Sequence, residues 1–264
     1  MTEQVRTPAI DAARYMASVQ ADADRILSLA PDCATSAVWG CPGWTVEMVV
    51  RHLGEVYLRQ STAISRGGRV PPGDPVGALG LDEDVFAYFE RARTRILTAI
   101  DRPADTSCWT WSKPAGRIGF WQRRMAQETL VHRVDVEQAA GLASRVDEDL
   151  AVDGVDEVLR LFLPLSLPID GPAFGIEPRL RASVVVSAGA VSWSVEVAGL
   201  QAQVTPGFDA GAAAYVCGEP GAVLLWLWGR SGGGDGPGAD DAVTLEGDAD
   251  QVTALRQALV AATQ

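Results

Sequence analysis

Hydrophobic residues recur at helical spacing through the first half of the chain and predict four amphipathic helices. Thr45 is a plausible N-cap for the second, and Pro31, Pro103 and Gly141 are expected to end the first, third and fourth. Segments 65–80 and 104–119, which contain several Gly and Pro residues, are expected to be connections. The predicted helices cover residues 9–30, the residues after Thr45, residues 82–102 and residues 120–140. Four such helices are typical of a helical bundle.

The pattern changes in the second half, which mixes helical and strand periodicity. Residues 182–186 and 191–197 are predicted strands with Gly189 in the turn between them. Apolar and polar residues alternate along the second strand, which predicts a β-hairpin with one wet face. A proline-rich loop is expected after the helix at 147–163, and a flexible loop at 231–241. The remaining predicted elements are a strand at 213–217, a helix from Pro220, a strand at 243–246 and a helix at 248–263. The sequence therefore predicts an α+β protein of two domains, a four-helix bundle at 1–143 and a smaller α+β domain with a hairpin sheet at 147–264.

The fourth predicted helix carries an unusual core stripe. Trp121, Met125, Glu128, His132, Asp135 and Ala139 follow one another at alternating spacings of four and three residues, so they share one face. Three of these six residues are ionisable. An unpaired charge in a bundle core costs several kcal/mol unless a partner or a metal compensates it. The stripe therefore indicates chemistry rather than packing alone.

Glu128 and His132 can bind one ion together, because residues four apart project from the same side of a helix. The second of the chain's two histidines, His52, lies beside the apolar stripe of the second predicted helix. Two imidazoles and one carboxylate would form a metal site with an open position. The alternative is a pair of core histidines satisfied by carboxylates such as Glu128, Glu55 or Asp135.

Composition limits the classes of partner. The net charge of −12 disfavours nucleic acids and anionic membranes, and an anionic substrate would need a local positive group. No apolar run approaches the roughly 20 residues that span a bilayer, and no signal peptide is evident, so a cytoplasmic protein is expected. The four cysteines are scattered and are expected to be free thiols. Cys41 could be a ligand or a nucleophile, or else a small buried residue.

Three segments, CPGWTVEMVVRHLGEV, RRMAQETLVHRVDVEQAAG and LLWLWGR, resemble the mycothiol-dependent maleylpyruvate isomerase family. The resemblance spans nearly the whole chain and implies a DinB-like metal-binding bundle followed by the family's C-terminal domain. It also implies zinc held by His52, Glu128 and His132. Mycothiol is then expected as the thiol cosubstrate, bound to the metal as a thiolate nucleophile.

Such a site permits several functions. The thiolate could add to a conjugated double bond and be expelled after rotation, which is cis-trans isomerisation, or remain on a small electrophile as an S-conjugate. A metal-stapled binding module and a hydrolase using metal-bound water are the alternatives. Arg230 is the candidate catalytic residue that grips a substrate carboxylate, or else a helix C-terminal cation. Asp135 would orient a ligand or be an exposed or capping carboxylate, and Arg123 and Arg124 are expected at the surface.

Overall fold

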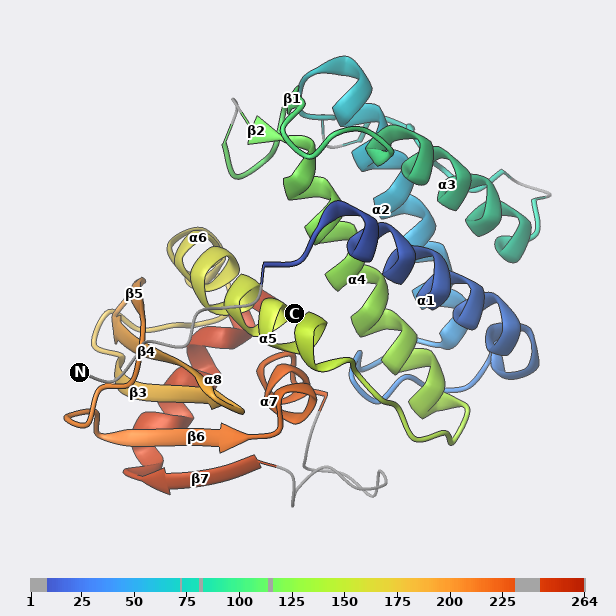
Figure 1. Ribbon diagram of the computed structural model, residues 1–264. Coiled ribbons are helices and arrows are strands. Elements are labelled where there is room, and N and C mark those ends of the chain that lie inside the picture. Colours follow the sequence, from blue (N-terminus) through green and yellow to red (C-terminus); the bar gives the residue numbers. More distant parts are fainter. Residues whose placement is uncertain (1–8, 72, 81–82, 114–115, 231–242, 264) are drawn as a thin grey trace. The chain divides into compact units, whose positions relative to one another are not determined.

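The computed structural model describes residues 9–71, 73–80, 83–113, 116–230 and 243–263, and these form two compact units. The first spans residues 10–144, and the second comprises the residues from 145 onward together with Ala9. The expected α+β fold class is confirmed, with helices alone dominating the first unit and a sheet with helices forming the second (Figure 1). The predicted loop at 231–241 lies outside the described residues.

Four long helices make up the first unit: α1 (Ala12–Cys33), α2 (Val46–Arg66), α3 (Val85–Ile100) and α4 (Ile118–Ala139). The predicted N-cap of α2 is confirmed, since the Thr45 side chain accepts a hydrogen bond from the backbone N–H of Met48. Pro31 does not end α1, which continues for two more residues. A proline so close to a helix end removes little more than one backbone hydrogen bond.

The connection before α4 contains a short hairpin of two-residue strands, β1 (Ser107–Cys108) and β2 (Gly116–Arg117). Helix α4 follows it directly and packs against α1, α2 and α3, which buries residues on nearly every side of the helix. Its polar residues are therefore inside the unit.

An ion-pair cluster joins α4 to α1. Arg133 Nε lies 2.9 Å from Asp22 Oδ1, and Arg133 Nη1 lies 2.6 Å from Glu137 Oε2. Arg25 Nε donates to the other oxygen of Glu137 at 2.9 Å. The two helices are thus tied by two carboxylates and two guanidinium groups, in addition to their apolar contacts.

The second unit starts with α5 (Glu148–Glu157), a π-helical turn η1 (Val158–Phe162) and α6 (Leu163–Asp170). The predicted proline-rich loop after residue 163 is therefore wrong as far as Asp170, because the chain stays helical to that residue, whereas Pro172 lies in the turn that follows. The N–H of Leu163 bonds to the carbonyl of Val158 across the wide turn, and Pro164 falls in the first turn of α6. Pro164 has no N–H to donate, so one intrahelical hydrogen bond is missing at this wide turn.

Five strands of the second unit form one sheet. The strands are β3 (Arg181–Ala188), β4 (Val191–Ala198), β5 (Gln201–Pro206), β6 (Ala214–Gly218) and β7 (Val243–Gly247). Their order in the sheet is β5-β4-β3-β6-β7, with β3 and β6 parallel and the other pairs antiparallel. Helices α7 (Pro220–Leu227) and α8 (Ala249–Thr263) pack against β3 and β6.

The predicted β-hairpin is confirmed, with Val184 paired to Val195 and Gly189 in the turn at a φ of 59°. The prediction that one face of the hairpin is exposed to solvent is wrong for β3, because Val185 and Ser187 on that face are also buried. Strand β3 lies in the middle of the sheet between β4 and β6, so neighbouring strands and side chains shield both of its faces.

Candidate metal centre

Helices α2 and α4 bring together the three residues predicted to bind a metal. His52 projects from α2, and Glu128 and His132 lie one turn apart on α4. Glu128 Oε1 is 3.3 Å from His52 Nε2 and 3.6 Å from His132 Nε2. The two imidazole rings are 5.2 Å apart between centroids and inclined by 73°. Both Nε2 atoms therefore converge on one carboxylate oxygen.

These separations fit the donor set of a small tetrahedral ion. One donor atom from each of the three residues lies within 4.8 Å of the others. Zinc binds nitrogen and oxygen at about 2.0–2.2 Å, so two donors of a tetrahedral site lie about 3.3–3.6 Å apart. Hydrogen bonds between imidazole and carboxylate are usually shorter, at about 2.7–2.9 Å. The chemistry and the spacing of the three side chains both suit a divalent cation.

Asp135 fixes the orientation of the His132 ring. The Nδ1–H of His132 donates to Asp135 Oδ2 at 2.9 Å, which directs Nε2 toward Glu128. Asp135 is 1% exposed, so the prediction that it is an exposed carboxylate is wrong. Burial disfavours the imidazolium, but hydrogen bonds to Asp135 and Glu128 outweigh it and raise the pKa of His132 to about 9.

Arg124 holds the second oxygen of Glu128, with 2.7 Å between Nη2 and Oε2. Its side chain is 3% exposed, so the expectation of a surface position is wrong. Burial would raise the pKa of Glu128, but hydrogen bonds from His132 and His52 and the charge of Arg124 keep it well below its usual value. Glu128 is therefore ionised, with Oε1 turned to the histidines. In the sequence, the spacing of four residues between Arg124 and Glu128 was the pattern that could have indicated this ion pair.

The segment before α2 borders the site. Trp44 packs edge-on against the His52 ring, with 5.2 Å between centroids. Cys41 Sγ donates to Asp135 Oδ2 at 3.7 Å, so its thiol contacts the carboxylate that orients His132. All four cysteines are free, as expected. The His52 side chain is 34% exposed, which leaves this side of the site open to small molecules.

Arg230 belongs to the second unit, just beyond the end of α7. It is 4% exposed, and its Nη1 donates to the carbonyl of Trp228 at 2.7 Å. A bond to a carbonyl near a helix C-terminus is the contact that the dipole-neutralising alternative predicted. A role for Arg230 toward a substrate carboxylate stays a prediction.

The family described as "Mycothiol maleylpyruvate isomerase N-terminal domain" matches residues 16–137. This range includes α2, all but the last two residues of α4, and the three converging side chains. The four-helix part of the chain is therefore similar to this enzyme family, and the resemblance predicted from sequence is confirmed.

Two solved structures share the fold over both units. They are crystal structures of the mycothiol-dependent maleylpyruvate isomerase and of a histidine-to-alanine mutant of it. The mutant structure has a TM-score of 0.60 and 12% sequence identity, and the other a TM-score of 0.57 and 13% identity. Each alignment covers 90% of this chain and 95% of the other. No curated protein matches the chain significantly.

Proposed function

We propose that this chain is a zinc-dependent enzyme that uses mycothiol as its thiol cosubstrate on a small electrophile. The observation that carries the proposal is the convergence of two Nε2 atoms on one carboxylate oxygen, at 3.3 and 3.6 Å. His52, Glu128 and His132 would hold the ion. Bound there, zinc would keep a thiol deprotonated at neutral pH.

The surrounding residues would tune the site without touching the ion. Asp135 holds the His132 ring through Nδ1 and leaves Nε2 as the donor atom. Arg124 occupies Glu128 Oε2, so Glu128 would offer one oxygen instead of two. Because a tetrahedral site with three protein ligands keeps a fourth position open, a thiol could enter.

The alternative, a metal that has only a structural role in the bundle, requires a fourth protein ligand. Glu55, one candidate, pairs with Arg51 at 3.0 Å on a half-exposed part of α2. Asp135 and Cys41 group with His132 through its Nδ1 side, separately from the His52 and Glu128 donors. In the described part of the chain, this grouping favours an open site over a closed structural one.

Metal analysis tests the site first. We expect about one zinc per chain, with affinity reduced at least about tenfold in His52→Ala and Glu128→Ala. Glu55→Ala is the matched control and should keep its zinc. Unchanged zinc content in both ligand variants would refute the site.

Turnover tests the reaction. The zinc-loaded protein is incubated with mycothiol and a maleylpyruvate-type cis-enoic acid, and separately with an alkylating electrophile. Proton NMR detects the trans isomer, and mass spectrometry detects an S-conjugate. We expect one of these products to require both zinc and mycothiol. Consumption of substrate without mycothiol would favour a hydrolase using bound water instead.

Arg230 is proposed as the group that binds a substrate carboxylate. Arg230→Gln should then reduce turnover of an anionic substrate at least about tenfold while the zinc content is unchanged. Full turnover in this variant would leave Arg230 with its contact to the Trp228 carbonyl as its role.

A further inference from the structure

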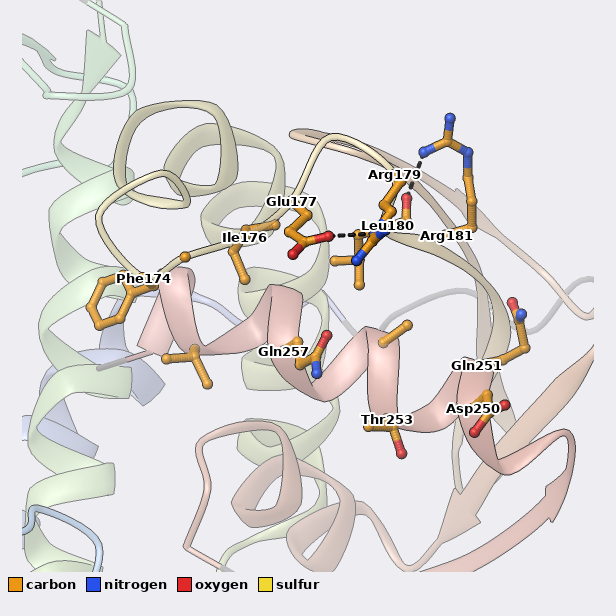
Figure 2. Close-up of a pocket in the computed structure, with 13 residues that line it drawn as sticks. Phe174, Ile176, Glu177, Arg179, Leu180, Arg181, Asp250, Gln251, Thr253 and Gln257 are labelled. Carbon is orange, nitrogen blue, oxygen red and sulfur yellow. Dashed lines mark hydrogen bonds and ion pairs between the residues drawn. The ribbon is translucent and has the colours of Figure 1, made fainter.

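Two hollows flank α8 in the second unit, and they differ in charge. The larger, about 710 Å³, has two arginines and two acidic residues among its lining, Arg179, Arg181, Glu177 and Asp250 (Figure 2). Arg179 forms an ion pair with Glu177, and Arg181 donates to the carbonyls of Pro178 and Leu180. The two positive and two negative side chains that line this pocket therefore balance one another.

The smaller hollow, about 290 Å³, is lined by the end of α7 and one side of α8. Among the residues that the structure describes, its lining includes one arginine, Arg256, and no acidic residue. The polar side chains beside Arg256 are those of Gln257, Thr253 and Thr263. This cavity thus carries a net positive charge in a protein whose formal net charge is −12.

The Arg256 side chain is held in place by neutral groups. Its Nη1 donates to the Trp226 carbonyl, and its guanidinium carbon lies 4.4 Å from the centroid of the Trp226 ring. No described carboxylate pairs with it. Burial lowers the pKa of Arg256, the direction expected when nothing nearby balances the charge. Among the described residues, one acceptor is bonded to its five N–H donors, so the other N–H groups can bind a ligand.

The two threonines limit what the ligand can be. Thr253 Oγ1 donates to the Ala249 carbonyl and Thr263 Oγ1 to the Leu259 carbonyl, so each hydroxyl proton is already committed. Donors for an anion therefore come from Arg256 and from the amide of Gln257. Guanidinium groups bind planar carboxylates and phosphates in bidentate fashion, and Leu227 and Leu259 give the cavity an apolar side.

We propose that the cavity beside Arg256 binds a small oxyanion, a carboxylate or a phosphate, on the C-terminal unit. This site is independent of the metal centre, and its test does not require the enzyme to turn over. A purely structural role for Arg256, capping the carbonyl end of α7, is the competing explanation.

Calorimetric titration of the full chain with inorganic phosphate and with succinate tests the proposal, and uncharged succinamide serves as the ligand control. We expect saturable binding of at least one anion at 1:1 stoichiometry and none of succinamide. Comparison of the two anions tells carboxylate from phosphate. Arg256→Gln should weaken binding at least about tenfold, as loss of a charge-assisted bidentate contact predicts. Arg179→Gln, from the balanced pocket, should bind as the parent does.

A second variant keeps the proposal testable if Arg256→Gln does not fold. Gln257→Leu removes an exposed amide donor from the cavity and leaves the Trp226 contacts intact, so it should fold and bind several-fold more weakly. Equal anion affinity in Arg256→Gln and the parent would overturn the proposal, as would the absence of saturable binding to the parent. A loss of thermal stability in Arg256→Gln with unchanged anion binding would assign Arg256 to capping alone.

Discussion

Arg124 and Glu128 form a buried ion pair one turn apart on α4, with 2.7 Å between Nη2 and Oε2. This pair leaves Glu128 with one oxygen directed at both histidines. The guanidinium therefore shapes the candidate metal centre without being one of its donors.

The contribution of Arg124 should depend on metal. Arg124→Met leaves the Glu128 carboxylate with less compensation, which should lower the free energy of unfolding by about 2 kcal/mol in metal-free protein. Zinc would replace part of the missing positive charge, so the loss should shrink in saturating zinc. Chemical denaturation with zinc and with a chelator measures both values. An equal loss under the two conditions would show that the pair acts independently of a metal.

The hydrogen bond from His132 to Asp135 should support metal affinity. Asp135→Ala frees the ring to rotate, and loss of such a supporting contact typically costs about 10–100-fold in affinity. Competition with a zinc indicator measures the change. Glu55→Ala is the control because Glu55 is a carboxylate of α2 outside the cluster. Parent affinity in Asp135→Ala would mean that packing alone fixes the ring.

The ion cluster of α1 and α4 predicts a pH-dependent stability. Burial would raise the pKa of Glu137, but the hydrogen bond from Arg25 and the charge of Arg133 hold it below 4.5. A depressed folded-state pKa stabilises the protein above the unfolded value, and this contribution is lost as pH falls through the folded value. Glu137→Gln should therefore cost about 2 kcal/mol at pH 7 and much less in acid.

Urea denaturation of Glu137→Gln at several pH values measures this dependence. Glu90→Gln, which alters an exposed carboxylate of α3, should match the parent throughout. A difference between Glu137→Gln and the parent that stays constant from pH 7 down to about pH 3 would contradict the assignment.

Gly54 sets the approach of α2 to α3, two residues beyond His52. A methyl group at this position would clash with the ring of Tyr88, which is itself fixed by a 2.5 Å bond to the Gly77 carbonyl. Alanine gains about 1 kcal/mol over glycine in helix propensity, whereas overpacking a core costs about 1–3 kcal/mol. We expect the clash to dominate, so Gly54→Ala should lower the melting temperature. Gly68→Ala, with open space around it, is the control.

The sequence predicted the candidate donors because helical periodicity puts charged residues on a core stripe, where they need a partner. Glu128 and His132 emerged in this way, and His52 was added as the chain's other histidine, beside the apolar stripe of the second predicted helix. Arg124 did not, since an arginine among polar neighbours on a helix is usually exposed. Its burial depends on how α4 is enclosed by three other helices, which periodicity along one helix does not encode.

The fold was predictable where pattern and propensity agreed, as in the hairpin of β3 and β4. Strand β5 was missed because it lies at the sheet edge and its residues, Gln201–Pro206, show no buried apolar alternation. The helical run through Pro164 was missed because a proline was taken as a stop. The wide π turn before it depends on a hydrogen bond from Leu163 that no residue type announces.

No described helix is long and apolar enough to cross a membrane.

The enclosure of α4 has a consequence for how firmly the helix is positioned. A helix held by leucine-like contacts alone can slide by one turn, about 5.4 Å, and find similar neighbours. Such a slide here would separate Arg133 from Asp22 and Glu137 from Arg25 at once, leaving only the pair of Arg133 and Glu137 within α4 intact. The ion pairs to α1 therefore fix the register of α4. Because Glu128 and His132 lie on the same helix, the same ion pairs also keep them opposite His52.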